Sequence, residues 1–514
     1  MRILGFPIKF NLVKKYLGII LIAFIAFFPC IVQGEIVAIS AGASHSLVLM
    51  ADGSVYSWGA NSDGQLGTGG TLESHVPVRV RDLTESGYLE GIVDIAAGNA
   101  FSLALAEDST VYAWGTNDFG QLGDGTILPS SLPVRVVDSS GTSSLNRIVA
   151  ISAGSFGCLA LDVSGGIWSW GSNREGALGR GDSDLDPHPI PGRVLFSAGA
   201  PLQEVADIVC GSMFSFALRE DSTLWAWGSN ADGQLGNDTT LSSYYPRPVL
   251  DSAGIDTLGS IVEITATGTG VFGIFGHALA TDSNGKAWSW GRNYNGQLGD
   301  GTISSRNLPL RVRNSAGTGF LIDIAQMSAG SEHSLTLLED GSVYGWGNNY
   351  YGVIGDNTTS DKHLPVRVHG IDNIGWLSDI VSIATSNRHN LALDIDGNLC
   401  AWGRNDYGQL GDGTTFQRNY PVAVLPIPIG VVEIPFKPDS LRVTVGPNPF
   451  NSAVRIRCSE NSNIEIFDLT GRKVESASGV EYLWRPSSEI PSGLYLLRIS
   501  ARDETYSARA VYLK

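Results

Sequence analysis

Four histidines stand at one position of a repeated sequence pattern and are the first candidates for chemistry. Each lies thirteen residues before a Trp-Gly dipeptide: His45, His277, His333 and His389. Neutral imidazole is a common metal ligand, so a ring of histidines could bind an ion. A repeated histidine can also donate to a neighbouring backbone carbonyl, and equivalent residues of a ring lie too far apart to share one ion. We therefore favour a structural role and expect no metal.

Aromatic residues form a second candidate set, in the segment that follows the Trp-Gly dipeptide. They are Phe119, Tyr294, Tyr350, Tyr351 and Tyr407. Equivalent positions in other repeats hold acids, namely Asp63, Glu175 and Asp232. A loop tip has no core to fill, so its aromatic residues are better binding candidates than those of a strand. The alternative is partial burial against the loop of the next repeat.

Residue patterns of known catalytic sites are missing from the sequence. It has no Gly-x-Ser-x-Gly, no His-Glu-x-x-His and no phosphate-binding loop. The Gly-Asp-Gly-Thr runs at 123–126 and 299–302 lack the alternating oxygen ligands of calcium loops, so their aspartates are expected to cap turns. Cys158, Cys210, Cys400 and Cys458 follow no Cys-x-x-Cys spacing, which predicts buried thiols instead of a disulfide framework or a zinc site. We assign no catalytic residue and no cofactor.

Composition limits the kinds of partner. The 514 residues include 34 Lys and Arg against 51 Asp and Glu, a net charge of −17. Nucleic acid is disfavoured as the main partner because phosphate binding needs a basic face. Glycine accounts for 63 residues without a Gly-X-Y period, which indicates many turns between many strands.

The first 34 residues have the pattern of a secretory signal peptide. Four basic residues precede an apolar run over 16–32, and small residues allow cleavage between Gly34 and Glu35. An uncleaved membrane anchor is the alternative, because the run is almost long enough to span a bilayer. Cleavage would remove four cations and no acid, leaving a mature charge of −21 that suits a protein outside the cell.

Seven Trp-Gly dipeptides mark an internal repeat. The tryptophans are Trp58, Trp114, Trp170, Trp227, Trp290, Trp346 and Trp402, at intervals of 56, 56, 57, 63, 56 and 56 residues. Each unit contains four short β-like runs, which in the second unit are 92–95, 102–105, 111–114 and 133–136. This pattern predicts an all-β fold, a seven-bladed β-propeller over 35–425, because radial repetition leaves only short sheet edges. An open solenoid would need atypical terminal repeats, which the first and seventh units are not.

The order of the strands predicts which loops share a face. In a four-stranded antiparallel meander the loops after the first and third strands open on one face, which therefore carries the histidines and the loop aromatics. The aspartyl hairpin before the third strand and the long link to the next unit open on the other face. We expect that second face, with links such as 138–147, to tolerate substitution. Each Trp and the residue two positions before it share one strand face, where we expect core packing.

Two motifs within the units resemble a known repeat family. Gly-x-Asn-x-x-Gly-Gln-Leu-Gly occurs at 115–123 and 403–411, and Ala-Gly-x-x-His-Ser-Leu occurs at 41–47 and 329–335. Both resemble the regulator of chromosome condensation repeat, over residues 36–425. The resemblance implies a seven-bladed propeller. Two copies, at 176–179 and 352–355, lack the Gln, and the stretch 268–276 is irregular.

A Pro-rich linker at 426–440 ends the repeats, and a different module occupies 441–514. Its β-like runs at 441–445, 454–457, 464–467, 495–499 and 507–513 predict a small β-sandwich. The segments 447–451, 466–474 and 492–495 and the terminal Lys514 resemble the C-terminal sorting domain of the type IX secretion system. In that family the tail is an address that is usually cut off or exchanged for a surface anchor. The resemblance implies a Gram-negative bacterium, contact with the secretion machinery, and passage through the periplasm to the cell surface or the medium.

Three classes of function remain open from the sequence. The first is a secreted propeller that binds a protein or glycan partner. The second is an extracellular lyase or hydrolase that uses the central face of the propeller. The third, guanine-nucleotide exchange, is known in the eukaryotic part of the family and is disfavoured because small GTPases are not found outside the cell. Fold alone does not imply function, but secreted bacterial propellers of this repeat type include protein inhibitors of β-lactamase, which favours binding.

Overall fold

The computed structural model describes residues 35–196, 199–266 and 276–427 of the repeat region. In the tail it describes 443–446, 454–468, 472–487, 490, 493–501 and 504–512. The predicted signal peptide, most of the linker and the irregular stretch at 268–275 lie outside the described residues. The chain divides into two compact units, Met1–Pro428 and Ile429–Lys514, and each is described by itself.

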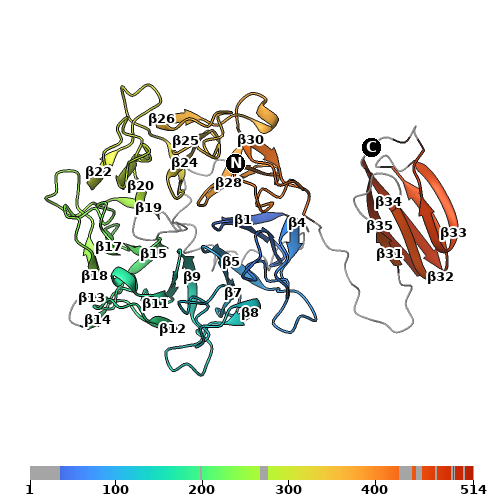
Figure 1. Cartoon of the computed structure of the whole chain (residues 1–514), viewed down its shortest axis with the longest axis horizontal. Coiled ribbons are helices and arrows are strands. Elements are labelled where there is room, and N and C mark those ends of the chain that lie inside the picture. Colours follow the sequence, from blue (N-terminus) through green and yellow to red (C-terminus); the bar gives the residue numbers. More distant parts are fainter. Residues whose placement is uncertain are drawn as a thin grey trace, which may run out of the picture. The chain divides into compact units, whose positions relative to one another are not determined.

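Seven four-stranded antiparallel sheets, or blades, form the first unit (Figure 1). Blade 1 contains β1 (Ile36–Ala41), β2 (His45–Met50), β3 (Val55–Gly59) and β4 (Ser74–Arg79). Blade 2 contains β5 (Ile92–Ala97), β6 (Phe101–Ala106), β7 (Val111–Gly115) and β8 (Ser130–Arg135). Blade 3 contains β9 (Ile148–Ala153), β10 (Gly157–Asp162), β11 (Ile167–Ser172) and β12 (Pro187–Arg193). Blade 4 contains β15 (Val205–Cys210), β16 (Phe214–Arg219), β17 (Leu224–Gly228) and β18 (Ser243–Pro248).

The remaining three blades repeat this order. Blade 5 contains β19 (Ile261–Ala266), β20 (His277–Asp282), β21 (Ala287–Gly291) and β22 (Arg306–Arg311). Blade 6 contains β23 (Ile324–Ala329), β24 (His333–Leu338), β25 (Val343–Gly347) and β26 (Lys362–Arg367). Blade 7 contains β27 (Ile380–Thr385), β28 (His389–Asp394), β29 (Leu399–Gly403) and β30 (Arg418–Ala423). A hairpin of β13 (Leu195–Phe196) and β14 (Ala200–Pro201) and two 3₁₀ turns, η1 (Arg174–Gly176) and η2 (Ile371–Asn373), complete the unit.

The Trp-Gly dipeptide ends the third strand of six blades and lies one residue before the end of β11 in blade 3, and both of its residues have a structural role. All seven tryptophans are fully buried and contribute to apolar clusters, most of which combine residues of neighbouring blades. The glycine that follows has a positive φ, +105° at Gly59, where a Cβ would lie 2.5 Å from the carbonyl oxygen of Ser44. Only glycine fits this approach of the third strand to the loop between the first two strands.

The residues two positions before these tryptophans are less uniformly buried than the sequence predicts. Tyr56 and Cys400 are buried, but the other five are only partly buried. Two of them stack on an arginine of the fourth strand: Trp168 on Arg193 at 3.9 Å from the ring centroid, and Trp288 on Arg311 at 5.5 Å. The outer edge of a blade is thus stabilised partly by cation–π contact.

The ring closes without an exchange of strands between the ends of the repeat region. β1 packs beside β27 and β28 (Figure 1), and every blade consists of four consecutive strands. The Trp58 indole donates to the carbonyl of Gln409 at 2.9 Å, and the Ser46 hydroxyl donates to the same carbonyl at 2.9 Å. Ile427 packs partly buried against the cluster at this boundary, so the first residues after β30 still belong to the propeller.

The second unit is a five-stranded antiparallel sheet of β31 (Val443–Gly446), β32 (Val454–Phe467), β33 (Lys473–Trp484), β34 (Gly493–Ala501) and β35 (Glu504–Tyr512). Two strands that the sequence predicts, 454–457 and 464–467, are one long strand, and β33 was not predicted. Ile456, Ile464 and Trp484 belong to a buried cluster on this sheet. The described residues form one sheet, so the second layer of a β-sandwich stays a prediction. Among the described residues of the chain, no helix is long and apolar enough to cross a membrane.

Candidate functional site

The two ends of the blades differ in the loops that they carry. The β1–β2 and β3–β4 loops meet on one side, where the Ala60 amide donates to the carbonyl of Ser44 at 2.8 Å. We call this side, with its equivalents in all blades, the loop face. The hairpin between β2 and β3 and the links between blades meet on the opposite side, the link face, where the Ile92 amide donates to the carbonyl of Gly53. The arrangement is the one that the strand order predicts.

The four histidines begin the second strand of blades 1, 5, 6 and 7 and are buried at the blade boundaries. Each Nε2 lies within hydrogen-bond distance of a polar side chain of the next blade. The pairs are His45–Ser102 at 3.0 Å, His277–Ser334 at 2.8 Å, His333–Asn390 at 2.7 Å and His389–Ser46 at 2.9 Å. The prediction that these histidines donate to backbone carbonyls is therefore wrong, because each acceptor is a side-chain hydroxyl or amide oxygen.

The tautomer of these histidines follows from the partners of the acceptors. The single hydroxyl proton of Ser102 goes to the carbonyl of Gln65 at 3.0 Å, so Ser102 must accept from Nε2–H of His45. The carbonyl of Gln65 also accepts the indole N–H of Trp114 at 2.9 Å. One carbonyl of blade 1 thus binds two side chains of blade 2, and the histidine completes the connection.

Burial disfavours the charged imidazolium at all four positions. It lowers the pKa of His45, His277 and His389 to about 3 and that of His333 to about 4. These histidines are neutral in the folded protein at neutral pH. No group of three or more His, Cys, Asp or Glu side chains in the described part of the chain is placed to hold a metal ion.

The predicted loop aromatics all lie on the loop face but differ in exposure. Tyr294, Tyr350 and Tyr407 are exposed by 59 %, 70 % and 40 %. Phe119 is half-buried, with its ring edge-on to Phe156 of the next blade at 5.2 Å between centroids. Phe119 thus follows the alternative of partial burial against a neighbouring loop, whereas the three exposed tyrosines do not.

Tyr351 connects the loops of blades 6 and 7. The guanidinium of Arg388 lies 4.8 Å from its ring centroid and donates to its hydroxyl at 3.0 Å, and that of Arg404 lies 5.3 Å from the same centroid. Arg404 also lies 5.8 Å from the Tyr407 ring, and Tyr350 packs edge-on to Tyr351 at 4.9 Å. We call Tyr350, Tyr351, Arg388, Arg404 and Tyr407 the Arg–Tyr cluster.

A second arginine–tyrosine pair extends this surface to blade 5. Arg292 lies 5.1 Å from the Tyr294 ring centroid and forms an ion pair of 3.4 Å with Glu332 of blade 6. Burial raises the pKa of Asp232 in blade 4, and the positive charge of Arg292 counteracts that rise. Arg292 thus forms an ion pair with blade 6 and acts electrostatically on blade 4, next to the exposed tyrosines.

Buried asparagines hold the loops that carry these tyrosines, a role that the sequence analysis missed. Asn349 is fully buried. Its Nδ2 donates to the Asp356 carboxylate and to the carbonyls of Thr358 and Ser360, and its Oδ1 accepts the amide N–H of Ile354 at 2.9 Å. The invariant spacing of Asn within the seven Gly-x-Asn motifs was the available signal. The loops are thus fixed by internal hydrogen bonds.

The arginines of the cluster were also missed. Arg388 directly precedes a repeat histidine and Arg404 directly follows a Trp-Gly dipeptide, positions that hold other residue types in most repeats. The expected turn-capping role of the Gly-Asp-Gly-Thr aspartates matches the structure, since Asp300 accepts the amide of Thr302 at 2.9 Å.

The link face also exposes aromatic residues, and its tolerance of substitution stays a prediction. Phe320 and Trp376 are exposed by 49 % and 52 %. Arg311 stacks on Phe320 at 4.9 Å, and His369 is edge-on to Trp376 at 4.9 Å. These two residues therefore serve as the comparison for any role assigned to the loop face.

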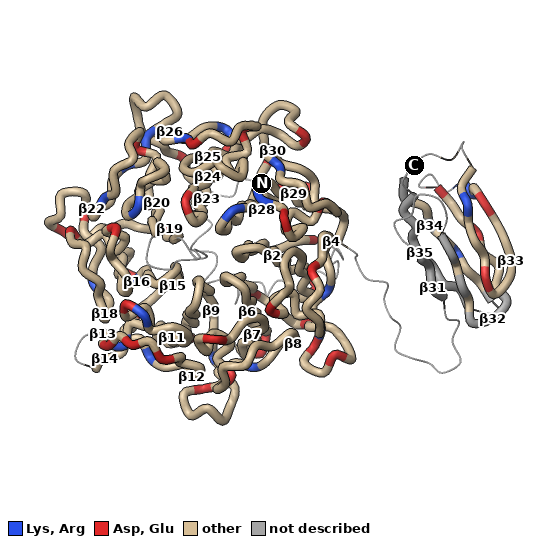
Figure 2. The backbone as a smooth tube through the Cα atoms, in the orientation of Figure 1, with Lys and Arg blue, Asp and Glu red and all other residues tan. Residues whose placement is uncertain are grey.

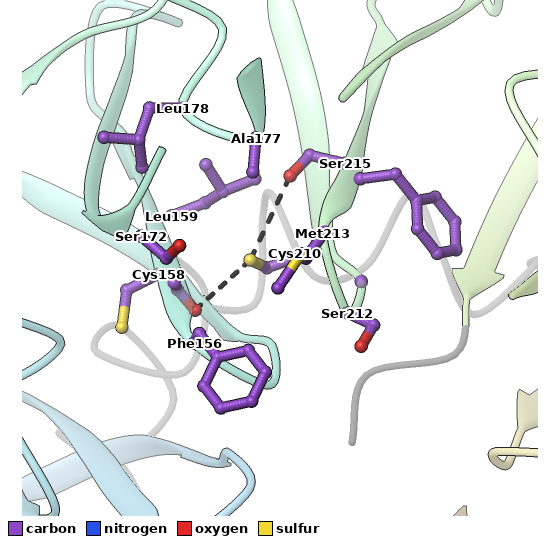
Figure 3. A pocket seen from close by; sticks show the side chains of 13 residues that line it. Phe156, Cys158, Leu159, Ser172, Ala177, Leu178, Cys210, Ser212, Met213 and Ser215 are labelled. Atoms are coloured by element: carbon purple, nitrogen blue, oxygen red, sulfur yellow. Dashed lines mark hydrogen bonds between the residues drawn. The ribbon is translucent and has the colours of Figure 1, made fainter. Parts of the chain in front are cut away.

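A small cavity lies between blades 3 and 4 (Figure 3). Its volume of about 10 Å³ is that of a single water site at most. Cys158 and Cys210 line it, and the Cys210 thiol contacts the carbonyl of Gly157 at 3.3 Å. Burial raises the pKa of both thiols, to about 12 for Cys210, so neither is a reactive thiolate. This cavity cannot admit a substrate.

Comparison with known families agrees with this architecture. The RCC1-like domain matches residues 24–320, more than half of the chain. The chain belongs to this family. Regulator of chromosome condensation (RCC1) repeats match 340–393 and 396–436, and the secretion system C-terminal sorting domain matches 444–512. The RCC1-like protein therefore carries a type IX sorting tail, which directs export to the cell surface or the extracellular space.

Several known proteins are similar to the propeller. The ultraviolet-B receptor UVR8 of Arabidopsis thaliana is 32 % identical over 390 residues, which cover 75 % of this chain and 81 % of the receptor. The E3 ubiquitin-protein ligase HERC2 of Mus musculus is 30 % identical over 375 residues, 73 % of this chain but only 7 % of the ligase.

Two solved structures share the fold. Prp20p of Saccharomyces cerevisiae has a TM-score of 0.55 at 25 % identity, with 70 % of this chain and 84 % of that chain covered. Human WBSCR16 has a TM-score of 0.56 at 22 % identity, with 76 % and 96 % covered. Both likenesses support the propeller architecture.

Proposed function

We propose that this secreted propeller is a binding protein that recognises a protein or glycan partner outside the cell through the loop face of blades 5–7. The observation that carries the proposal is the exposure of Tyr294, Tyr350 and Tyr407 on loops held by buried asparagines. Aromatic side chains on a rigid support lose little conformational entropy on binding and are enriched among residues that dominate interface energies.

The relatives support a binding role without supplying the partner. The structure of Prp20p is described together with binding to Gsp1p and histones, so a propeller of this fold serves as a binding module in that protein. The similarity to HERC2 covers only 7 % of the ligase, so it gives no reason to propose ligase activity for this chain. The cavity of about 10 Å³ between blades 3 and 4 gives no support to an enzyme that works there.

Site-specific photo-crosslinking tests which face meets the partner. A photoreactive phenylalanine analogue replaces Tyr350 in one version of the full chain and Trp376 of the link face in another. Both versions are exposed to the surface fraction and culture medium of the producing cells. We expect a discrete crosslinked species from position 350 and none from position 376. Crosslinks only from position 376, or from neither, would overturn the proposal.

A further inference from the structure

We infer that the partner is a protein whose contact segment is acidic, and that Arg388 and Arg404 receive its carboxylates. The inference rests on the proposed function and specifies the chemistry of the same surface. It starts from the guanidinium groups of the Arg–Tyr cluster, whose hydrogen-bonding capacity is only partly used within the chain.

Arg388 uses one of its five N–H donors on a neutral partner. Its Nη1 donates to the Tyr351 hydroxyl at 3.0 Å while the guanidinium stacks on the Tyr351 ring. No carboxylate of the described residues forms an ion pair with Arg388. The stacking fixes the guanidinium plane, so the remaining donors are oriented before a ligand arrives.

The Arg404 guanidinium is hydrogen-bonded through its Nε, and its two Nη atoms remain available for a ligand. Its Nε donates to Asp406 at 2.6 Å, and its ring contacts to Tyr351 and Tyr407 hold the plane of the group. The two Nη atoms make no hydrogen bond within the described residues. The pair of Nη donors matches the two oxygens of a carboxylate, which guanidinium groups bind in bidentate form.

The surrounding charge favours an acidic ligand at this place over others. The protein as a whole carries −17, and Figure 2 shows Asp and Glu around the ring. On the loop face, blades 1, 3 and 4 have Asp63, Glu175 and Asp232 where blades 6 and 7 have Tyr351 and Tyr407. Asp63 and Glu175, which are not buried, repel an acidic segment, whereas Arg388 and Arg404 attract it, so charge complementarity orients the partner.

The aromatic surroundings favour a protein over a sulfated glycan. Tyr and Arg are the residue types enriched at the energetic centres of protein–protein interfaces, and here they alternate within one contact network. A polyanionic glycan would be expected to meet a stripe of exposed cations, whereas the Arg–Tyr cluster contains only two arginines, each stacked on a tyrosine.

Defined probes test the inference on the full chain. A short peptide of alternating Glu and Tyr, labelled with a fluorophore, is compared with its Gln-for-Glu counterpart and with chondroitin sulfate. Arg388→Gln and Arg404→Gln are the test variants, and Arg135→Gln, exposed on β8, is the matched loss of one positive charge. We expect the Glu peptide to bind the unsubstituted chain and to lose ~10-fold or more in affinity with either test variant. Thermal unfolding of all variants checks that they are folded.

Several results would overturn the inference. Equal binding of the Glu and Gln peptides, no binding of the Glu peptide, or equal loss with Arg135→Gln would each contradict it. Binding of chondroitin sulfate but of neither peptide would indicate a glycan partner instead of an acidic protein. If crosslinking from position 350 succeeds while the arginine variants change nothing, the proposed function stands and only the acidic partner fails. If crosslinking fails as well, both are wrong.

Discussion

At the scale of single residues, the repeat histidines connect blades and do not form a site. Each neutral imidazole donates a hydrogen bond across a blade boundary to a side chain of blade 2, 6, 7 or 1. That side chain in turn donates to a backbone carbonyl of the preceding blade, and the same carbonyl also accepts the indole N–H of a tryptophan. The four equivalent histidines therefore join neighbouring sheets by hydrogen bonds. The residues left over for recognition are those that vary between repeats.

The histidines predict an acid-sensitive fold. Their folded pKa values of about 3 to 4 lie below the unfolded value of 6.5, so the unfolded chain binds protons first as the pH falls. Stability is therefore fully present above pH 6.5 and is lost as the pH falls towards 4, by about 1.4 kcal/mol per pH unit for each histidine. Urea unfolding at several pH values measures the slope, which His333→Gln should reduce by about a quarter. An unchanged slope in that variant would mean that other groups cause the acid lability.

A buried and an exposed tryptophan provide a matched test of the core. Trp227 is fully buried, and Trp227→Ala should lower the free energy of unfolding by ~3–5 kcal/mol because a large cavity remains. Trp376 is 52 % exposed on the link face, and Trp376→Ala should change it by less than ~1 kcal/mol. Denaturant titration of both variants gives the comparison. A loss under 1 kcal/mol for Trp227→Ala would show that this side chain is not part of the core.

At the scale of elements, the β3–β4 loop is the part of each blade that combines a fixed frame with a variable surface. The buried Asn and the glycines of the repeat motif hold its backbone, and Gly408 lies so close to His75 of the next blade that a Cβ would approach its ring within 2.4 Å. Between these fixed points the residues at positions such as 350 and 407 are free to differ. The frame explains how exposed aromatics keep a defined geometry.

Substitution of two equivalent asparagines distinguishes the contribution of the loop frame to stability from its contribution to binding. Asn349→Ala and Asn61→Ala each remove a buried side chain that donates to loop carbonyls, so each should cost about 1–3 kcal/mol of stability. Only Asn349→Ala should also weaken partner binding, because blade 6 carries Tyr350 and Tyr351 and blade 1 carries no loop aromatic. Thermal unfolding and partner affinity measured together distinguish the two effects. Equal affinity losses would show that general loosening of the ring, and not the blade 6 loop, controls binding.

The elements themselves were largely predictable from the sequence, and the contacts between them were not. In blade 2 the expected runs 102–105 and 111–114 agree with β6 and β7 to within a residue at each end. Alternating leucines mark the first run, and Val111, Tyr112 and Trp114 mark the second. β33 was missed because Ser, Ala and Glu dominate its first half. Arg388 and Arg404 were missed because their partner Tyr351 lies 37 residues before Arg388, in another blade, and single-sequence patterns carry no signal for such a pair.

At the scale of the whole molecule, the chain combines a closed ring with a separate export module. The ring closes through side-chain contacts between blades 7 and 1, so the propeller needs nothing from the tail to complete its sheets. The tail has its own apolar cluster on its own sheet. We therefore expect folding of one unit and export by the other to be separable properties.

Removing the tail tests this separation. Deletion of 441–514 should leave a folded propeller that accumulates in the periplasm, because the sorting domain that matches 444–512 is then missing. Cell fractionation with limited proteolysis of the periplasmic product reports both location and folding. Normal appearance of the truncated protein in the medium or at the cell surface would refute the role of the tail as an address.

The central claim is that the loop face of blades 5–7 is the binding surface, and partner affinity for alanine variants of both faces tests it most directly. Tyr351→Ala and Tyr407→Ala should each weaken binding of the crosslinked partner, once purified, by ~30-fold or more, since aromatic anchors contribute ~2 kcal/mol or more each. Trp376→Ala and Ser140→Ala on the link face should leave affinity within about threefold, and all four variants should remain folded. Equal losses on both faces, or a loss confined to the link face, would contradict the account.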